Sequence, residues 1–231
     1  MWHLPIANLT VMEYHLAQVK PAIVYTIAER EQLPSTKGSF PQMLEALGVK
    51  ETGMKPGPNQ YKFESGPGYI GKYQFCEALL IDLGYYKADV YYGKPGVSKN
   101  FWRGQWTGKK GIHSKSQFLN SPQAQESAIR EAFELYWSRL KDMLKKEGKS
   151  IKSFLGQKKT LPLKGTSKTV TITVSGILAG SHLQGADGMA NLLLKNQVSH
   201  DGNNTSISEY VYNYGGYETP VKDFTTPSPS Y

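Results

Sequence analysis

A carboxylate inside a glycine-rich, aromatic segment is the part of this sequence best suited to chemistry. Glu64 is followed by Gly66, Gly68 and Gly71, and then by an aromatic and apolar stretch that begins at Tyr73. Glycines let the backbone turn sharply and let a ligand approach it closely. An apolar wall of aromatic rings raises the pKa of a carboxyl group, so that the group holds its proton near neutral pH. Such a carboxyl group is the general acid that cleavage of a glycosidic bond requires.

Two short motifs lie in this segment, the pair Glu64-Ser65 and the triplet Tyr73-Gln74-Phe75. With the glycines between them, they resemble the catalytic core of lysozyme-like peptidoglycan-cleaving enzymes, the lytic transglycosylases and goose-type lysozymes. The first motif of that family is a Glu-Ser pair, and the second, matched loosely here, is of the Gly-aromatic-x-Gln type. The resemblance implies that Glu64 is the catalytic acid and that Ser65 holds its carboxylate. It also implies that Tyr73 and Gln74 contact the substrate.

A later segment resembles the third motif of the family, usually Ala-Tyr-Asn-x-Gly, with departures. His182 stands in place of the Tyr, Leu183 in place of the Asn, and Gly185 in place of the Gly. The Asn amide helps to hold substrate in the family, and a leucine cannot form that hydrogen bond. The resemblance therefore implies that His182 or Gln184 supplies the substrate contact. A lone histidine that is satisfied in the core is the alternative interpretation.

The segment near the C-terminus resembles the fourth motif, a Tyr followed by Val. Tyr210-Val211 fits best, with Tyr212 as the second choice. In the family this hydroxyl lies close to the catalytic Glu. The resemblance thus implies that Tyr210 orients the substrate or the acid.

The resemblance covers about residues 60–215 and implies cleavage of the β-1,4 bond between N-acetylmuramic acid and N-acetylglucosamine in peptidoglycan glycan strands. In a lytic transglycosylase one carboxylate suffices, because the muramic acid 6-hydroxyl is the nucleophile and a 1,6-anhydro product forms. A lysozyme usually uses a second carboxylate, and none stands in a motif that we recognise here. This favours a lytic transglycosylase over a hydrolytic muramidase. A cell-wall-binding protein without catalysis is a further alternative.

Composition limits the partners. The chain has 231 residues and a net charge of +8, which favours an anionic partner. Arginine is scarce and no nucleic-acid motif is present, so we expect no nucleic acid. One cysteine excludes an intrachain disulfide, and the sequence shows no Cys/His set with metal spacing. The expectation is therefore an enzyme with neither metal nor cofactor.

No apolar stretch approaches the roughly 20 residues of a membrane span, and no basic segment precedes an apolar run at the N-terminus. We therefore expect neither a membrane span nor a signal peptide. An enzyme of the bacterial wall would then reach the periplasm by phage lysis, in a virion or through a secretion system. A secreted effector of this kind would have an immunity protein as partner.

The elements that position these residues are expected to form a mainly α, lysozyme-like domain with a small β-hairpin. Residues 40–47 predict a helix capped by Ser39, and residues 73–83 predict a buried helix. Residues 121–147 give the clearest helix, with Ser121 as its cap and Pro122 in its first turn. Alternating β-branched residues over 169–174 predict a strand of a hairpin near 158–174.

Three regions follow from this pattern. Residues 1–59 are expected to form an N-terminal helical segment packed on the core, and residues 60–217 the catalytic domain. Residues 218–231, which end in Thr-Pro-Ser-Pro-Ser-Tyr, are expected to be a flexible tail.

Overall fold

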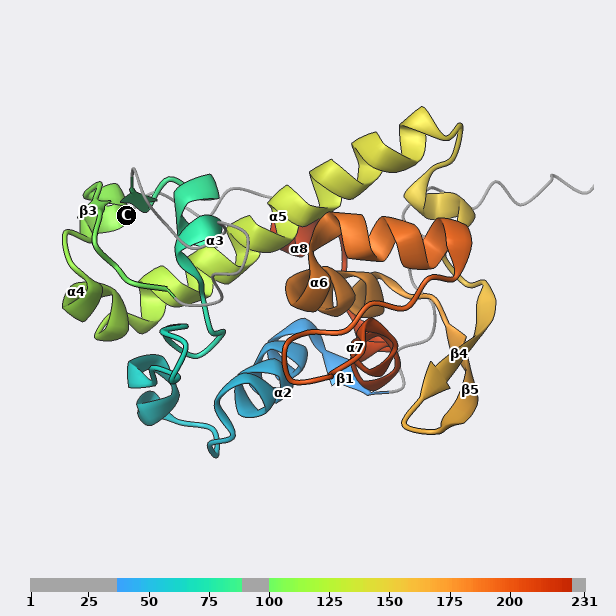
Figure 1. The fold of residues 1–231 in the computed structure, drawn as a ribbon, viewed down its shortest axis with the longest axis horizontal. Helices are drawn as coiled ribbons and strands as arrows, with labels where there is room; N and C mark the ends of the chain where they lie inside the picture. Colours follow the sequence, from blue (N-terminus) through green and yellow to red (C-terminus); the bar gives the residue numbers. More distant parts are fainter. Residues whose placement is uncertain (1–36, 89–99, 226–231) are drawn as a thin grey trace, which may run out of the picture. The chain divides into compact units, whose positions relative to one another are not determined.

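The computed structural model describes residues 37–88 and 100–225, and the following account is limited to them. The chain divides into two units, Met1–Glu31 and Gln32–Tyr231, and the described residues all belong to the second. Most of the predicted first segment, residues 1–36, therefore lies outside the described part. The described part is mainly α-helical, as predicted, and contains three two-stranded sheets (Figure 1).

The α-helices are α2 (Phe40–Thr52), α3 (Glu77–Asp82), α4 (Lys115–Leu119), α5 (Pro122–Lys146), α6 (Val174–Lys195), α7 (Ile207–Tyr214) and α8 (Lys222–Thr225). Short 3₁₀ helices are η1 (Pro58–Lys62), η2 (Lys109–Gly111) and η3 (Ile151–Ser153). The strands are β1 (Gly38–Ser39), β2 (Tyr86–Lys87), β3 (Gln105–Trp106), β4 (Lys158–Leu163), β5 (Thr166–Thr171) and β6 (Tyr217–Glu218).

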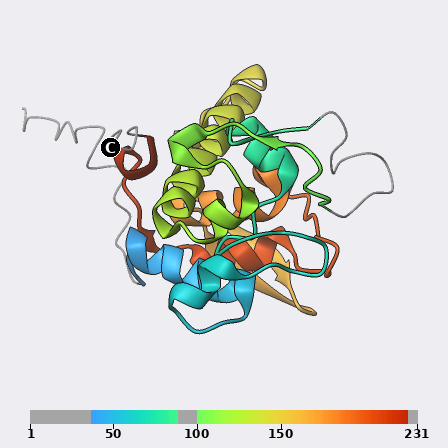
Figure 2. The same ribbon diagram turned by 90° about the vertical axis from the view of Figure 1, so that its left-hand side faces the viewer.

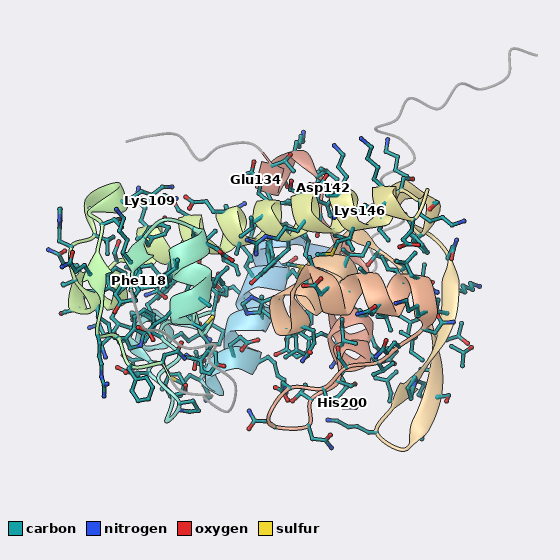
Figure 3. All side chains as sticks on the ribbon, turned by 45° about the horizontal axis from the view of Figure 1, so that its top comes forward. Lys109, Phe118, Glu134, Asp142, Lys146 and His200 are labelled. Atoms are coloured by element: carbon teal, nitrogen blue, oxygen red, sulfur yellow. The ribbon has the colours of Figure 1, made fainter. Side chains whose placement is uncertain are left out.

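Helix α5 is the longest helix of the described part, and its prediction is confirmed. The Ser121 hydroxyl accepts a hydrogen bond from the Ala124 N–H at 3.2 Å, so the side chain satisfies one of the free donors at the start of the helix. One face of α5 packs on α6, and α4 and α8 contact it as well. Glu134, Asp142 and Lys146 are exposed along this helix (Figure 3).

Helix α2 begins where predicted but continues five residues further, to Thr52 rather than residue 47. Ser39 and Gln42 form a capping box at its start, and Gly53 ends it with a left-handed φ of 68°. Met43 and Leu47 on its inner face are fully buried in the core cluster that also contains Ile70 and Tyr73. Helix α2, which belongs to the expected N-terminal segment 1–59, therefore packs on core residues that follow residue 60.

The predicted helix over 73–83 is wrong in its first third. Gln74 has a left-handed φ of 48°, and Phe75 pairs through its backbone with Ile70, so this stretch is a tight turn. Helix α3 begins only at Glu77, with the Cys76 thiol accepting a hydrogen bond from the Leu79 N–H. The apolar composition of this segment reflects burial of Tyr73 and Phe75 in the core rather than helical periodicity.

The predicted hairpin is confirmed. Strands β4 and β5 pair antiparallel, with Lys158 opposite Thr171 and Leu163 opposite Thr166. The two turn residues, Lys164 and Gly165, both have positive φ, which suits the right-handed twist of a two-residue hairpin. This hairpin packs on α7.

Helices α6 and α7 form the closest helix pair. Where α6 faces α7, a Cβ at Gly180 would lie 3.0 Å from Val211 Cγ2, and one at Gly176 would lie 3.1 Å from the Val211 oxygen. Glycine at these positions therefore lets the two backbones approach each other. Gly185, at φ 68° and ψ 176°, breaks α6 into two parts. Figure 2 shows α4 and the start of α5 toward the viewer, with α2 below them.

The expected flexible tail is wrong for residues 218–225. Strand β6 pairs in parallel with β1, and α8 lies on α5 with Phe224 only 1% exposed. Burial of Phe224 among core aromatics gives this segment a fixed place. Residues 226–231 lie outside the described part. No helix within the described ranges is long and apolar enough to cross a membrane.

Candidate active site

Glu64 lies in an exposed ion pair. Both of its carboxylate oxygens are 2.9 Å from Lys115 Nζ at the start of α4, and its side chain is 38% exposed. The Ser65 hydroxyl accepts a hydrogen bond from the Tyr69 N–H at 3.1 Å and so serves the turn that follows. The expected contact from Ser65 to the Glu64 carboxylate is therefore not formed, because the hydroxyl is engaged by the local backbone.

Tyr73 and Gln74 are engaged within the protein. Tyr73 is fully buried, and its hydroxyl donates a 2.6 Å hydrogen bond to Glu126 Oε1 on α5. The Gln74 amide donates to the Gly71 oxygen at 2.9 Å and closes the turn on itself. A direct substrate contact through Tyr73 does not fit this burial, whereas the amide nitrogen of Gln74 has a second N–H beyond the one in its turn bond.

Two of the three remaining predicted site residues, Tyr210 and His182, meet at a different carboxylate, Glu51. The Tyr210 hydroxyl on α7 donates a 2.6 Å hydrogen bond to Glu51 Oε1, and His182 Nε2 on α6 lies 3.6 Å from the same oxygen. Glu51 lies in the last turn of α2, and its side chain is 15% exposed. Three helices thus place a carboxylate, a phenol and an imidazole together.

His182 is neutral at neutral pH in this setting. Its side chain is 6% exposed, and its ring packs edge-on against Phe133, with the ring centroids 6.5 Å apart. Burial lowers the pKa of His182 below its ordinary value, and this effect outweighs the Glu51 carboxylate and the Tyr73 backbone, which raise it. The contact with Glu51 is therefore that of a neutral ring beside a carboxylate.

Tyr210 is held as a hydrogen-bond donor. Its side chain is 3% exposed, and its ring lies 5.3 Å from that of Tyr214. Burial, and then the charge of Glu51, raise the pKa of Tyr210 above its ordinary value. The phenol therefore stays protonated and donates a hydrogen bond to Glu51 Oε1.

This arrangement distinguishes the two oxygens of Glu51. Oε1 receives the Tyr210 hydroxyl and faces His182, whereas the contacts within the described ranges leave Oε2 unoccupied. A carboxyl group with one oxygen fixed and the other open can exchange a proton with a ligand from a defined direction. The phenol therefore fixes one oxygen of the Glu51 carboxylate.

Gln184 is half-buried at the point where Gly185 breaks α6, two residues beyond His182. The structure thus brings His182 and Tyr210 to one carboxylate and places Glu64, with Ser65, in a separate ion-paired loop. Sequence reasoning missed Glu51. A signal was present, since Glu51-Thr52-Gly53 also places a hydroxyl residue after a carboxylate, at the end of an amphipathic helix and before a glycine-rich loop.

No family model, curated protein or solved structure matches this chain. Among the residues that the structure describes, no group of three or more His, Cys, Asp or Glu side chains could hold a metal ion.

Proposed function

We propose that this protein cleaves the β-1,4 bond between N-acetylmuramic acid and N-acetylglucosamine in peptidoglycan, with Glu51 as its acid/base. The observation that supports it most is the 2.6 Å hydrogen bond from Tyr210 to Glu51. In the lysozyme-like enzymes that the sequence resembles, the hydroxyl of the fourth motif lies close to the catalytic Glu. Tyr210 was assigned to that motif, and the carboxylate beside it is Glu51.

In this proposal the reacting form of the enzyme has Glu51 protonated on Oε2, and this carboxylic acid donates its proton to the oxygen of the leaving sugar. Positive charge then develops on the muramic acid ring, and the Glu51 carboxylate lies beside it. The same carboxylate next accepts the proton of the muramic acid 6-hydroxyl, whose oxygen closes on the anomeric carbon to give the 1,6-anhydro product. Tyr210 fixes the carboxylate through Oε1 in both steps, and His182 lies on the same side.

Glu64 is the weaker candidate for the acid. Lys115 occupies both of its oxygens, so a proton donor there would first have to give up this ion pair. Within the described ranges, Glu51 has one oxygen engaged by a neutral phenol and no contact to the other. The geometry thus favours the carboxylate of α2 over the one in the Glu-Ser pair.

A transglycosylase remains our choice over a hydrolytic lysozyme. The groups that contact Glu51 within the described ranges are a phenol and an imidazole rather than a second carboxylate. A substrate that supplies its own hydroxyl needs only one carboxylate. Hydrolysis would instead require a base to activate water.

The test is mass spectrometry of the soluble products from purified peptidoglycan, with wild type, Glu51→Gln and Glu64→Gln compared. Each substitution replaces a carboxylate with an amide of the same size. We expect anhydro-muropeptides from wild type and from Glu64→Gln, and none from Glu51→Gln. Loss of products in Glu64→Gln alone would identify Glu64 as the general acid. Reducing-end products would indicate a lysozyme, and no products from wild type would leave a wall-binding protein.

A further inference from the structure

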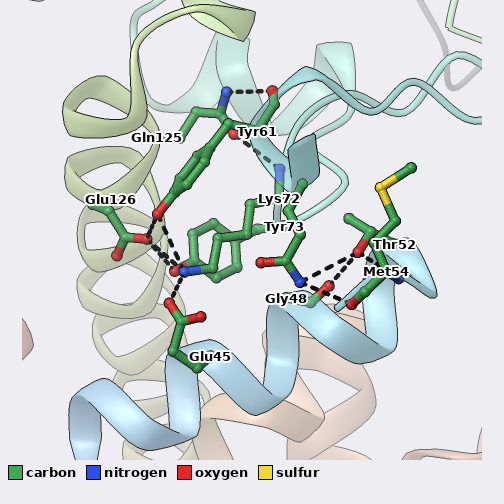
Figure 4. Close-up of polar contacts among 10 residues, drawn as sticks. Glu45, Gly48, Thr52, Met54, Tyr61, Lys72, Tyr73, Gln125 and Glu126 are labelled. Carbon is green, nitrogen blue, oxygen red and sulfur yellow. Dashed lines mark hydrogen bonds and ion pairs between the residues drawn. The ribbon is translucent and has the colours of Figure 1, made fainter. Parts of the chain in front are cut away.

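The side chain of Lys72 ends in a buried ammonium group that contacts residues from three segments of the chain (Figure 4). Its side chain is 1% exposed. The ammonium contacts Glu45 on α2, lies 3.0 Å from Glu126 Oε1 on α5, and lies 3.2 Å from the Tyr61 hydroxyl on η1. A charge removed from water requires close partners, and here each partner comes from a different element.

Aromatic rings complete the surroundings of this ammonium group. Lys72 Nζ lies 5.1 Å from the ring centroid of Tyr61 and 5.2 Å from that of Tyr73, within the range of cation–π attraction. Both phenols also donate to Glu126 Oε1, at 2.8 Å and 2.6 Å. Glu126 Oε1 therefore accepts from Lys72 and from both tyrosines, which fixes α5 to the segment around residue 72.

The aliphatic part of Lys72 lies directly on α2. A Cβ at Gly48 would be 2.7 Å from Lys72 Cε and Cγ, so only glycine leaves room for the stem. Gly48 precedes Glu51 by three residues, which is one turn of the helix. The backbone N–H of Lys72 is held in turn by Gln125 Oε1 on α5 at 2.9 Å.

We propose that Lys72 is the positioning residue for Glu51. It fixes α2 against α5 one turn before Glu51, so that the carboxylate reaches Tyr210 and His182 on the helices beyond. The role depends on the proposed function of Glu51 as the acid/base. Lys72 itself touches neither the proposed reacting atoms nor Glu51, and it acts through the placement of α2.

The test compares Lys72→Met with wild type. Methionine keeps an unbranched stem for the contact with Gly48 and removes the charge. The matched control is Lys168→Met, the same change at an exposed lysine on β5. We expect kcat for peptidoglycan cleavage to fall about 10- to 100-fold with KM little changed, because a small displacement of a catalytic group has effects of this size. Lys168→Met should keep the wild-type kcat.

A second readout does not depend on activity. Hydrogen exchange of the amides over residues 49–53 should become faster in Lys72→Met, while exchange in α7 stays as in wild type. If wild type releases no products, the proposed function fails, and this exchange alone then decides whether Lys72 fixes the end of α2. Unchanged exchange over 49–53, or an unchanged kcat in an active protein, would overturn the proposal.

Should Lys72→Met fail to fold, Glu126→Gln takes its place. This variant keeps the shape of the side chain and removes the charge that faces Lys72. We expect the same direction of change in kcat and in exchange over 49–53, and no change in both measurements would overturn the proposal.

Discussion

The Tyr210 hydroxyl and Glu51 Oε1 lie 2.6 Å apart although 159 positions separate the two residues in the sequence. The bond joins the last turn of α2 to α7 in a buried setting. It brings a phenol assigned from one motif to a carboxylate that no motif had indicated. This contact defines the candidate active site, so its removal is the first change to make.

Tyr210→Phe removes the donor and leaves the ring in place. A hydrogen bond to a charged group contributes about 1.5–3 kcal/mol, so we expect a loss of that order in the free energy of unfolding. The rate of wall cleavage should fall roughly tenfold because the carboxylate loses its fixed orientation. Urea denaturation and initial rates measure the two effects. Tyr212→Phe, a residue 43% exposed on the same helix, should change neither. Equal effects of the two variants would contradict the assignment.

His182 should make stability depend on pH. Burial lowers the pKa of His182 in the folded protein below its ordinary value of 6.5. As the pH falls, His182 therefore gains its proton in the unfolded chain before it does so in the folded protein. The free energy of unfolding consequently has its full value above pH 6.5 and declines as the pH falls below it. The slope reaches up to about 1.4 kcal/mol per pH unit.

The measurement is urea denaturation between about pH 7.5 and pH 5. His182→Gln keeps a side-chain donor but does not titrate, so its free energy of unfolding should fall less steeply than that of wild type. Parallel curves for the two proteins would show that folding does not change the pKa of His182.

Glu77→Ala should destabilise the protein through the loop that begins at residue 100. The buried Glu77 carboxylate accepts hydrogen bonds from the backbone N–H groups of Phe101 and Trp102, at 3.0 and 2.9 Å. Its removal leaves both donors without an acceptor, which costs roughly 2–5 kcal/mol in the free energy of unfolding. Glu77→Gln retains an acceptor and should lose less. Glu134→Ala, at an exposed position, is the control, and a loss of similar size there would refute the explanation.

Gly71→Ala and Gly53→Ala should lower the free energy of unfolding by different amounts, although both glycines have positive φ. Gly53 faces open space at φ 68°, so alanine there adds only the strain of the left-handed conformation, about 1–2 kcal/mol. A Cβ at Gly71 would lie 2.2 Å from Gln125 Oε1, the acceptor of the Lys72 N–H. Gly71→Ala must therefore displace a buried side chain as well. Urea denaturation of the two variants should show the greater loss for Gly71→Ala, and equal losses would rule out the contact.

The elements with strong local signals were predicted from the sequence. Helix α5 has a cap, a proline in its first turn and a regular apolar stripe, and all three act within the segment itself. The β4–β5 hairpin likewise has a strand pattern and a turn residue with free φ. The stretch from Tyr73 to Phe75 was assigned to a helix because its residues are apolar, and composition alone does not distinguish a buried turn from a buried helix.

For the candidate site, the sequence by itself determined which residue types were available, and it indicated His182 and Tyr210. It could not determine which carboxylate they would face, because the Glu64-Ser65 and Glu51-Thr52 pairs are alike as local patterns. The tertiary structure decided between them. Helix α6 packs closely on α7, and α2 packs against the buried Lys72. In this arrangement Tyr210 and His182 contact Glu51, whereas Glu64 forms an ion pair with Lys115. Contacts between distant segments depend on packing across the whole core, and no single segment of the sequence encodes them.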